Sequence, residues 1–122
     1  MDKIKHSICI IGLGYVGLPL AFYLSKKFNV IAFDTNKKRI NQLKSNLDIN
    51  KEINKSQLKT FNLNSKITYN EDELKTSSIY IVTVPTPITK TNLPDLSNLE
   101  KACAIISRHI KKNDLVIFES TV

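Results

Sequence analysis

Hydrophobic residues occur along this chain in two alternating patterns, short continuous runs and longer stretches with helical spacing. The first run, Ile8–Ile11, precedes a stretch in which Val16, Leu20, Leu24 and Phe28 recur every four residues. Continuous runs are typical of strands buried on both faces, and a four-residue recurrence is typical of a helix with one apolar face. The alternation predicts an α/β fold, a Rossmann-like doubly wound parallel sheet with helices on both faces.

The same pattern divides the rest of the chain into further elements. The strands are expected at residues 7–11, 30–33, 66–69, 79–84 and 115–118, with 66–69 at an edge of the sheet. Thr35 or Asn36 is expected to cap a second helix, and the polar segment 48–64 to contain a short one. A short helix is expected at 72–76, and Ser97 with Glu100 forms a possible capping box for a helix reaching about residue 110. The buried positions expected in these helices and the 48–64 segment are Ile40, Leu43, Leu47, Ile53, Leu58, Phe61, Leu99, Cys103 and Ile106.

The turn after the first strand contains all three glycines of the chain, in a GxGxxG pattern. Gly12 would let the chain turn sharply, Gly14 would leave room for a pyrophosphate, and Gly17 would let the first helix lie close to the strand. The amides of Tyr15 and Val16 would then point at the pyrophosphate from the positive end of the helix dipole. The turn therefore predicts a bound dinucleotide, with a ligand-free tight turn as the alternative.

Asp34 follows the second strand, about 20 residues beyond the first glycine, where dinucleotide-binding folds place the carboxylate that binds ribose. It would accept hydrogen bonds from the adenosine ribose hydroxyls. Its charge would also repel a 2′-phosphate, so NAD is the expected cofactor rather than NADP.

Length and composition limit the other possibilities. The 122 residues, 42% of them hydrophobic, predict one domain spanning 1–122. The net charge is +7, but the sequence has no arginine-rich cluster and no interleaving of aromatic with basic residues, so we expect no nucleic-acid partner. No apolar run approaches the ~20 residues of a membrane span, and the start leaves no room for a signal peptide, which predicts a cytoplasmic protein with no membrane partner. Cys9 and Cys103 lack metal-ligand spacing, so no metal site is expected, and both are interpreted as packed, reduced thiols.

Two further strand ends would meet the glycine turn, because ligands of open parallel sheets lie beyond the carboxyl ends of the strands. Thr86 is held between Pro85 and Pro87, and its hydroxyl could reach the cofactor or merely belong to a stiff loop. Thr121 could touch ribose, nicotinamide or substrate, or begin a turn. Spacing alone does not decide between these alternatives.

Four motifs occur here in one order: Gly12–Pro19, Val84–Pro87, Pro94–Leu96 and Glu119–Val122. Together they resemble the N-terminal NAD-binding domain of the UDP-glucose/GDP-mannose dehydrogenase family over essentially the whole chain. The Val-Pro-Thr-Pro and Glu-Ser-Thr-Val loops look most like the UDP-N-acetylglucosamine or UDP-N-acetylgalactosamine 6-dehydrogenases of bacterial capsule and O-antigen synthesis.

The resemblance implies roles for individual residues. Tyr15 and Val16 match backbone contacts to the NAD pyrophosphate, and Asp34 matches the ribose ligand. Arg39 matches a basic position beside the adenosine ribose, with a solvated helix arginine as the alternative. Thr86 and Thr121 match threonines lining the NAD cleft, and Thr121 also matches one that positions a catalytic water.

The resemblance also implies what the whole enzyme does. Such enzymes oxidise the C6 alcohol of a UDP-sugar to a carboxylate with two NAD, through a cysteine-bound intermediate. That cysteine, the central helix used for dimer contacts and the sugar-binding domain belong to segments beyond Val122. We therefore expect an N-terminal fragment, ending after the fifth strand, of a homodimeric enzyme, able to bind NAD but not to complete catalysis. Two alternatives remain, a stand-alone NAD-binding or redox-sensing module and another dehydrogenase of the same fold, such as a hydroxyacid type.

Overall fold

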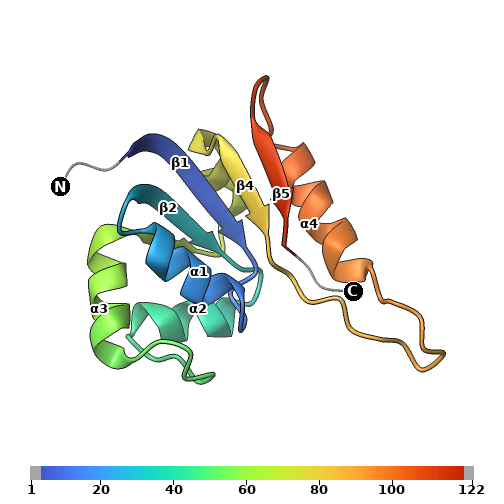
Figure 1. The fold of residues 1–122 in the computed structure, drawn as a ribbon, viewed down its shortest axis with the longest axis horizontal. Helices are drawn as coiled ribbons and strands as arrows, with labels where there is room; N and C mark the ends of the chain where they lie inside the picture. Colours follow the sequence, from blue (N-terminus) through green and yellow to red (C-terminus); the bar gives the residue numbers. More distant parts are fainter. Residues whose placement is uncertain (1–3, 120–122) are drawn as a thin grey trace.

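Five parallel strands form one sheet in the order β3-β2-β1-β4-β5 in the computed structural model, which describes residues 4–119 (Figure 1). The order confirms the doubly wound α/β fold and the edge position of β3, and it places the topological switch between β1 and β4. The elements are β1 (Ile4–Ile11), α1 (Gly17–Leu24), β2 (Phe28–Phe33), α2 (Lys37–Lys44), α3 (Lys55–Asn64), β3 (Lys66–Thr68), the 3-10 helix η1 (Glu71–Thr76), β4 (Ile79–Val82), α4 (Ser97–Ser107) and β5 (Leu115–Phe118).

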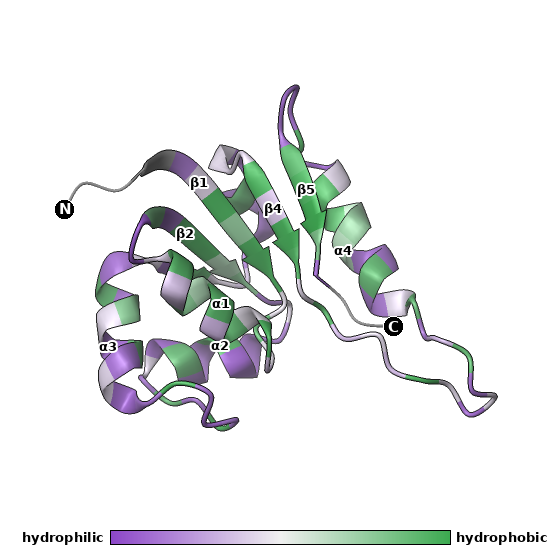
Figure 2. Cartoon of the chain, in the orientation of Figure 1, coloured by the Kyte–Doolittle hydropathy of each residue, from purple (hydrophilic) through white to green (hydrophobic). Residues whose placement is uncertain are grey.

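The sheet separates two hydrophobic cores. Along β1, Ile8 and Ile10 face the core shared with α1, α2 and α3, whereas Cys9 and Ile11 face the core shared with η1 and α4. The strands are accordingly mostly hydrophobic in Figure 2, with hydrophilic residues near the start of β1 and of β2. Side chains on both faces are buried because successive residues of a strand point to opposite sides, which explains the continuous apolar runs of the sequence.

The buried face of α1 differs from the expected one. The predicted stripe of Val16, Leu20, Leu24 and Phe28 is confirmed only in part, because Leu20, Leu24 and Phe28 are partly buried against the core and Val16 is not. The helix runs only from Gly17 to Leu24, Val16 before it is exposed, and Phe28 belongs to β2. The residues that pack on the sheet are Gly17, Leu18, Ala21 and Phe22. Gly17 sets this rotation, because only a residue without a Cβ can face the carbonyl of Gly12 at this distance.

The ends of α2 and α3 show how the predicted connection is built. Asn36 caps α2 as expected, its side chain accepting a hydrogen bond from the Arg39 amide. Asn46, with φ 64°, ends the helix, and the Leu47 amide donates back to the Gln42 carbonyl, an arrangement typical of a Schellman motif. Leu47 consequently lies beyond the helix and is exposed, contrary to expectation. The short helix expected in 48–64 is α3, with Ile53, Leu58 and Phe61 buried as predicted.

The expected capping box at Ser97 and Glu100 is absent. Leu96 is the N-cap of α4, so Ser97 lies inside the helix, and its amide donates to the Asp95 side chain instead. A capping box does form at the start of α3, where Asn54 and Gln57 bond each other's backbone amides.

The second cysteine also differs from expectation. On α4 the buried residues are Ala102, Ile105 and Ile106, and Cys103 is exposed rather than packed. Cys9 is buried in β1 as expected, and burial raises the pKa of its thiol, which keeps it unreactive.

An ionic cluster joins η1 to the end of α4. Arg108 donates two hydrogen bonds to the Glu71 carboxylate, at 2.8 and 2.9 Å, and His109 Nε2 lies 2.8 Å from the same carboxylate. Hydrogen bonds from Arg108 and His109 lower the pKa of Glu71 to about 2. The cluster therefore ties the end of α4 to η1, on the face of the sheet opposite α1. Among residues 4–119, no helix is long and apolar enough to cross a membrane.

Candidate functional site

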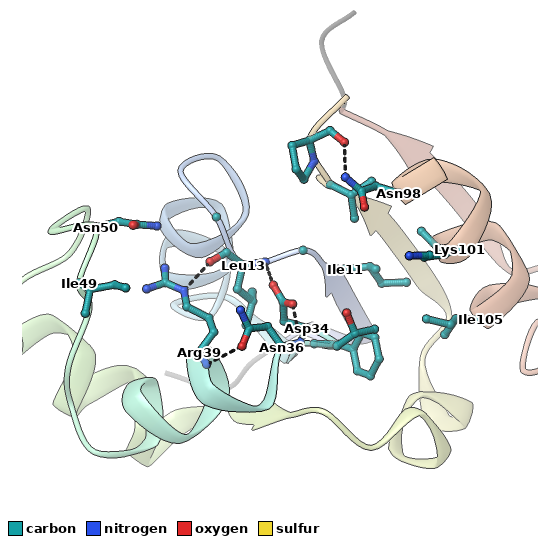
Figure 3. A pocket seen from close by; sticks show the side chains of 17 residues that line it. Ile11, Leu13, Asp34, Asn36, Arg39, Ile49, Asn50, Asn98, Lys101 and Ile105 are labelled. Atoms are coloured by element: carbon teal, nitrogen blue, oxygen red, sulfur yellow. Dashed lines mark hydrogen bonds between the residues drawn. The ribbon is translucent and has the colours of Figure 1, made fainter. Parts of the chain in front are cut away.

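An open cavity of about 400 Å³ lies at the carboxyl ends of β1, β2 and β4. In Figure 3, Asp34 occupies its centre, with Arg39, Ile49 and Asn50 on one side. Asn98, Lys101 and Ile105 of α4 lie on the other side. The cavity is therefore beside the switch between β1 and β4, where open parallel sheets bind their ligands.

Two glycines, Gly12 and Gly17, shape the turn beside this cavity. Gly12 has φ 102°, which a residue with a side chain rarely adopts, and its amide donates to the Phe33 carbonyl at 2.9 Å. A Cβ on Gly17 would collide with the Gly12 carbonyl oxygen and lie 2.5 Å from the Thr83 hydroxyl. The structure thus gives Gly12 and Gly17 the steric roles predicted for them, a sharp turn and a close helix.

Thr83 is a contributor that the sequence did not reveal. Its side chain is buried after β4, and its hydroxyl lies 2.7 Å from the Gly12 carbonyl oxygen and 3.1 Å from that of Ile11. The hydroxyl therefore ties the glycine turn to the neighbouring strand. These partners are 71 and 72 residues away in sequence, so only the β1–β4 pairing brings them together.

The next part of the turn presents backbone donors to open space. Within the described part of the chain, the amides of Tyr15 and Val16 have no hydrogen-bond partner, and helical bonding begins with the Leu18 amide donating to Gly14. In residues 4–119, apart from Gly14 and its two chain neighbours, no atom lies within 4 Å of the position that a Cβ on Gly14 would occupy. Free amides at the start of a helix beside an uncrowded glycine form an anion site.

Asp34 fastens the glycine turn to the end of β2. Its Oδ2 accepts a hydrogen bond from the Leu13 amide, and its Oδ1 accepts one from the Asn36 amide, both at 2.9 Å. The carboxylate is partly buried and lines the cavity. It is thus fixed in place while one side remains open to a ligand.

Arg39 holds the same turn from the opposite direction. Its Nε donates to the Leu13 carbonyl at 2.9 Å, and its Nη1 forms a 2.7 Å ion pair with Asp48. The alternative of a solvated arginine is wrong, because only 7% of Arg39 is exposed. Its Nη2 is buried and has no hydrogen-bond partner in the described residues.

Asp48 is the second contributor that sequence reasoning missed. Burial raises its pKa, but hydrogen bonds from Arg39 and from the Ile53 and Asn50 amides outweigh this effect, so the pKa lies below its usual range. The carboxylate is therefore ionised at neutral pH and balances the buried guanidinium. An aspartate just after a helix, followed by an Asn-Lys turn, was the available signal.

The two threonines have different outcomes. Thr86 is half-buried in the segment after β4, one residue beyond Pro85, which lines the cavity. Thr86 itself is not among the lining residues. The neighbouring Asn98 donates to the Pro85 carbonyl at 3.1 Å and so holds this segment against α4. Thr121 lies outside the described residues.

The donor set fits a dinucleotide. Free amides beside Gly14 suit a pyrophosphate, and a fixed carboxylate suits ribose hydroxyls. The orphaned Nη2 of buried Arg39 adds an unsatisfied donor at the same edge of the cavity. Among residues 4–119, no group of three His, Cys, Asp or Glu side chains is placed to hold a metal ion.

Comparison with known proteins agrees with this geometry. Residues 6–122 match the model of the NAD-binding domain of the UDP-glucose/GDP-mannose dehydrogenase family. The chain is 43% identical over 122 residues to a UDP-N-acetyl-D-glucosamine 6-dehydrogenase of Salmonella typhi, covering 100% of this chain and 28% of the relative. It is 43% identical over 118 residues to protein CapL of Staphylococcus aureus, covering 97% of this chain and 27% of the relative.

Solved structures give the same result. A UDP-D-ManNAc dehydrogenase from Pyrococcus horikoshii superposes with a TM-score of 0.87 at 33% identity, covering 95% of this chain and 28% of that one. A GDP-mannose dehydrogenase from Pseudomonas aeruginosa, solved as a ternary complex, superposes with a TM-score of 0.82 at 26% identity. The match covers 94% of this chain and 28% of that one. The chain thus spans little more than a quarter of the length of the proteins it matches.

Proposed function

Because the chain belongs to the UDP-glucose/GDP-mannose dehydrogenase family as its NAD-binding domain, we propose that NAD lies in the cavity at the carboxyl ends of β1, β2 and β4. The observation that carries this placement is the pair of unpartnered amides, Tyr15 and Val16, beside the open space at Gly14. The pyrophosphate would accept hydrogen bonds from these amides. Gly12 and Gly17 contribute by shaping the turn rather than by touching the cofactor.

The adenosine ribose would lie against Asp34 and Arg39. Asp34 is held by two backbone amides and retains acceptor capacity for a ribose hydroxyl, since a carboxylate has about four lone-pair sites. Arg39 supports the same edge of the cavity through the Leu13 carbonyl. Thr86 and Thr121 follow adjacent strands and are assigned to the nicotinamide end, with Thr121 also positioning water in the whole enzyme.

The whole protein is proposed to be an NAD-dependent UDP-sugar 6-dehydrogenase. The support is 43–44% identity to UDP-N-acetyl-D-glucosamine 6-dehydrogenases, across nearly all of this chain but about a quarter of theirs. The reaction would convert the C6 alcohol of a UDP-N-acetylhexosamine to a carboxylate. It would consume one water and two NAD⁺ and yield two NADH and three protons. Bound NAD accepts the hydride, and this chain's residues bind and orient it.

The setting of this reaction is also a proposal. One of the relatives is protein CapL, and this similarity supports a role in capsule or O-antigen polysaccharide synthesis. We also propose the cytoplasm as the location of the enzyme. We infer a homodimer for the whole protein, which size-exclusion chromatography with light scattering would test.

Asp34 provides the test of cofactor choice. We expect the chain to bind NAD⁺ more tightly than NADP⁺, because the Asp34 charge repels a 2′-phosphate. Asp34→Ala is expected to weaken NAD⁺ binding by about 1–3 kcal/mol, through loss of a charge-assisted hydrogen bond. Isothermal titration calorimetry with both cofactors measures these affinities.

Asp72→Ala is the matched control, since Asp72 lies in η1 and outside the cavity. It should bind both cofactors like the wild type. Equal or reversed preference in the wild type would contradict the role of Asp34, and unchanged affinity in Asp34→Ala would remove Asp34 from the site.

A further inference from the structure

The segment between α2 and α3 is folded around a single carboxylate. Asp48 accepts hydrogen bonds from the backbone amides of Asn50, Glu52 and Ile53, at 3.0, 2.8 and 3.2 Å. Its fourth bond comes from Arg39, and its side chain is 1% exposed. One buried group therefore holds the second half of the connection, residues 48–53, in place.

This connection holds one backbone conformation that needs such support. Lys51 has a φ of 56°, in the left-handed region that residues other than glycine seldom adopt. The Lys51 amide donates to the Asp48 carbonyl at 3.1 Å. Unfavourable backbone conformations persist only where the surroundings over-determine them, and they concentrate at ligand sites.

Asp48 acts on the cavity through Arg39. Its carboxylate fixes Nη1, which leaves Nε aimed at the Leu13 carbonyl. The amide of the same Leu13 donates to Asp34. A continuous path of hydrogen bonds thus runs from Asp48 through Arg39 to the residue in the middle of the glycine turn.

The same loop brings an apolar side chain to the cavity. Ile49 follows Asp48 directly, lines the cavity and is 57% exposed, which is unusual for isoleucine. Figure 3 shows Ile49 and Asn50 beside Arg39, at the side of the cavity away from α4. An exposed apolar residue in a cavity is suited to cover a flat, apolar ligand group such as a base.

We propose that Asp48 is a positioning residue for the cofactor, holding Arg39 against the glycine turn and Ile49 against the adenosine side of the cavity. This rests on the proposed function, because it takes the cavity as the NAD site. Asp48 touches no ligand itself. Its effect on binding passes through Arg39 and through the loop.

The test is calorimetry of Asp48→Asn with NAD⁺ and with AMP, which carries only the adenosine half. Both affinities should fall by about 10-fold, since Asn keeps the size of the side chain but loses its charged hydrogen bonds. In an Arg39→Lys background, the same substitution should change the affinities less than about 2-fold, because lysine cannot make both contacts. A merely structural role would lower the melting temperature and leave both affinities unchanged.

Asp114→Asn is the matched control, because the Asp114 side chain is also ion-paired and only 5% exposed, but it lies between α4 and β5. It should lose thermal stability without losing affinity. Ile49→Ala covers the case in which Asp48→Asn fails to fold, since removal of an exposed side chain leaves the core intact. Its AMP affinity should fall about 3-fold by loss of apolar contact.

Wild-type AMP affinity in Asp48→Asn or in Ile49→Ala would overturn the proposal, as would an equal effect of Asp48→Asn in both backgrounds. If one of these outcomes is found but Asp34→Ala still weakens NAD⁺ binding in the same series, the proposed function stands and only the role of Asp48 fails. If the wild type binds neither ligand, the proposed function fails and this inference with it.

Discussion

Gly17→Ala is expected to destabilise the chain by about 3 kcal/mol and to abolish detectable NAD⁺ binding. The new Cβ would collide with the Gly12 carbonyl and approach the Thr83 hydroxyl. The atom in its way is backbone, so α1 must move away from β1 and the turn must open. Urea denaturation followed by circular dichroism measures the loss of stability, and calorimetry measures binding.

Gly14→Ala is the control that separates fold from site. Beyond its two chain neighbours, no atom of the described chain lies within 4 Å of the added Cβ, so the free energy of unfolding should stay within about 1 kcal/mol of the wild-type value. The methyl group would nevertheless fill the space assigned to the pyrophosphate, so NAD⁺ affinity should fall. Tight NAD⁺ binding by Gly14→Ala would contradict the placement of the pyrophosphate, and a wild-type unfolding curve for Gly17→Ala would contradict the packing of α1.

Arg39→Leu is expected to lower the free energy of unfolding by about 3–5 kcal/mol. The substitution removes the ion pair to Asp48, leaves that buried carboxylate without its charged partner, and frees the Leu13 carbonyl. Denaturation at neutral pH measures the change. Because Asp48 would then lack its main charged donor, its pKa should rise in the variant. Acidification should therefore narrow the difference in the free energy of unfolding between the variant and the wild type.

Arg108→Leu is the matched comparison, since it also breaks an arginine–carboxylate pair. The Arg108 side chain, which pairs with Glu71, is 53% exposed, whereas the Arg39 side chain is 8% exposed. Exposed pairs contribute about 1 kcal/mol or less. Similar losses in the two variants would contradict the view that burial makes the Arg39–Asp48 pair important.

Much of the fold could be predicted because its signals are local. The apolar runs specify strands buried on both faces, and the glycine spacing specifies the turn that joins β1 to α1. The rotation of α1 could not be predicted from its apolar residues alone. It is set by the contact between Gly17 and Gly12, and Leu20 and Leu24 merely border the core.

Sequence spacing could point to individual residues of the candidate site, but it could not reveal the contacts between them. The distance of Asp34 from the glycines was enough to propose it for the site, and the structure places it in the lining of the cavity. Thr83 and Asp48 contribute through contacts with the turn and with Arg39, which only the folded chain brings together. The capping box shows the same limit: Ser97 and Glu100 have the right spacing, but α4 begins with Leu96 as its cap.

The central claim is that NAD binds at the glycine turn, and amide NMR spectra of the isotope-labelled chain during NAD⁺ titration test it most directly. The amide signals of Tyr15 and Val16, which have no partner in the described chain, should shift most, together with those of Leu13 and Asn36, whose amides donate to Asp34. Saturable shifts confined to other regions, such as the surface around Tyr69, or no shifts at saturating NAD⁺, would contradict the claim.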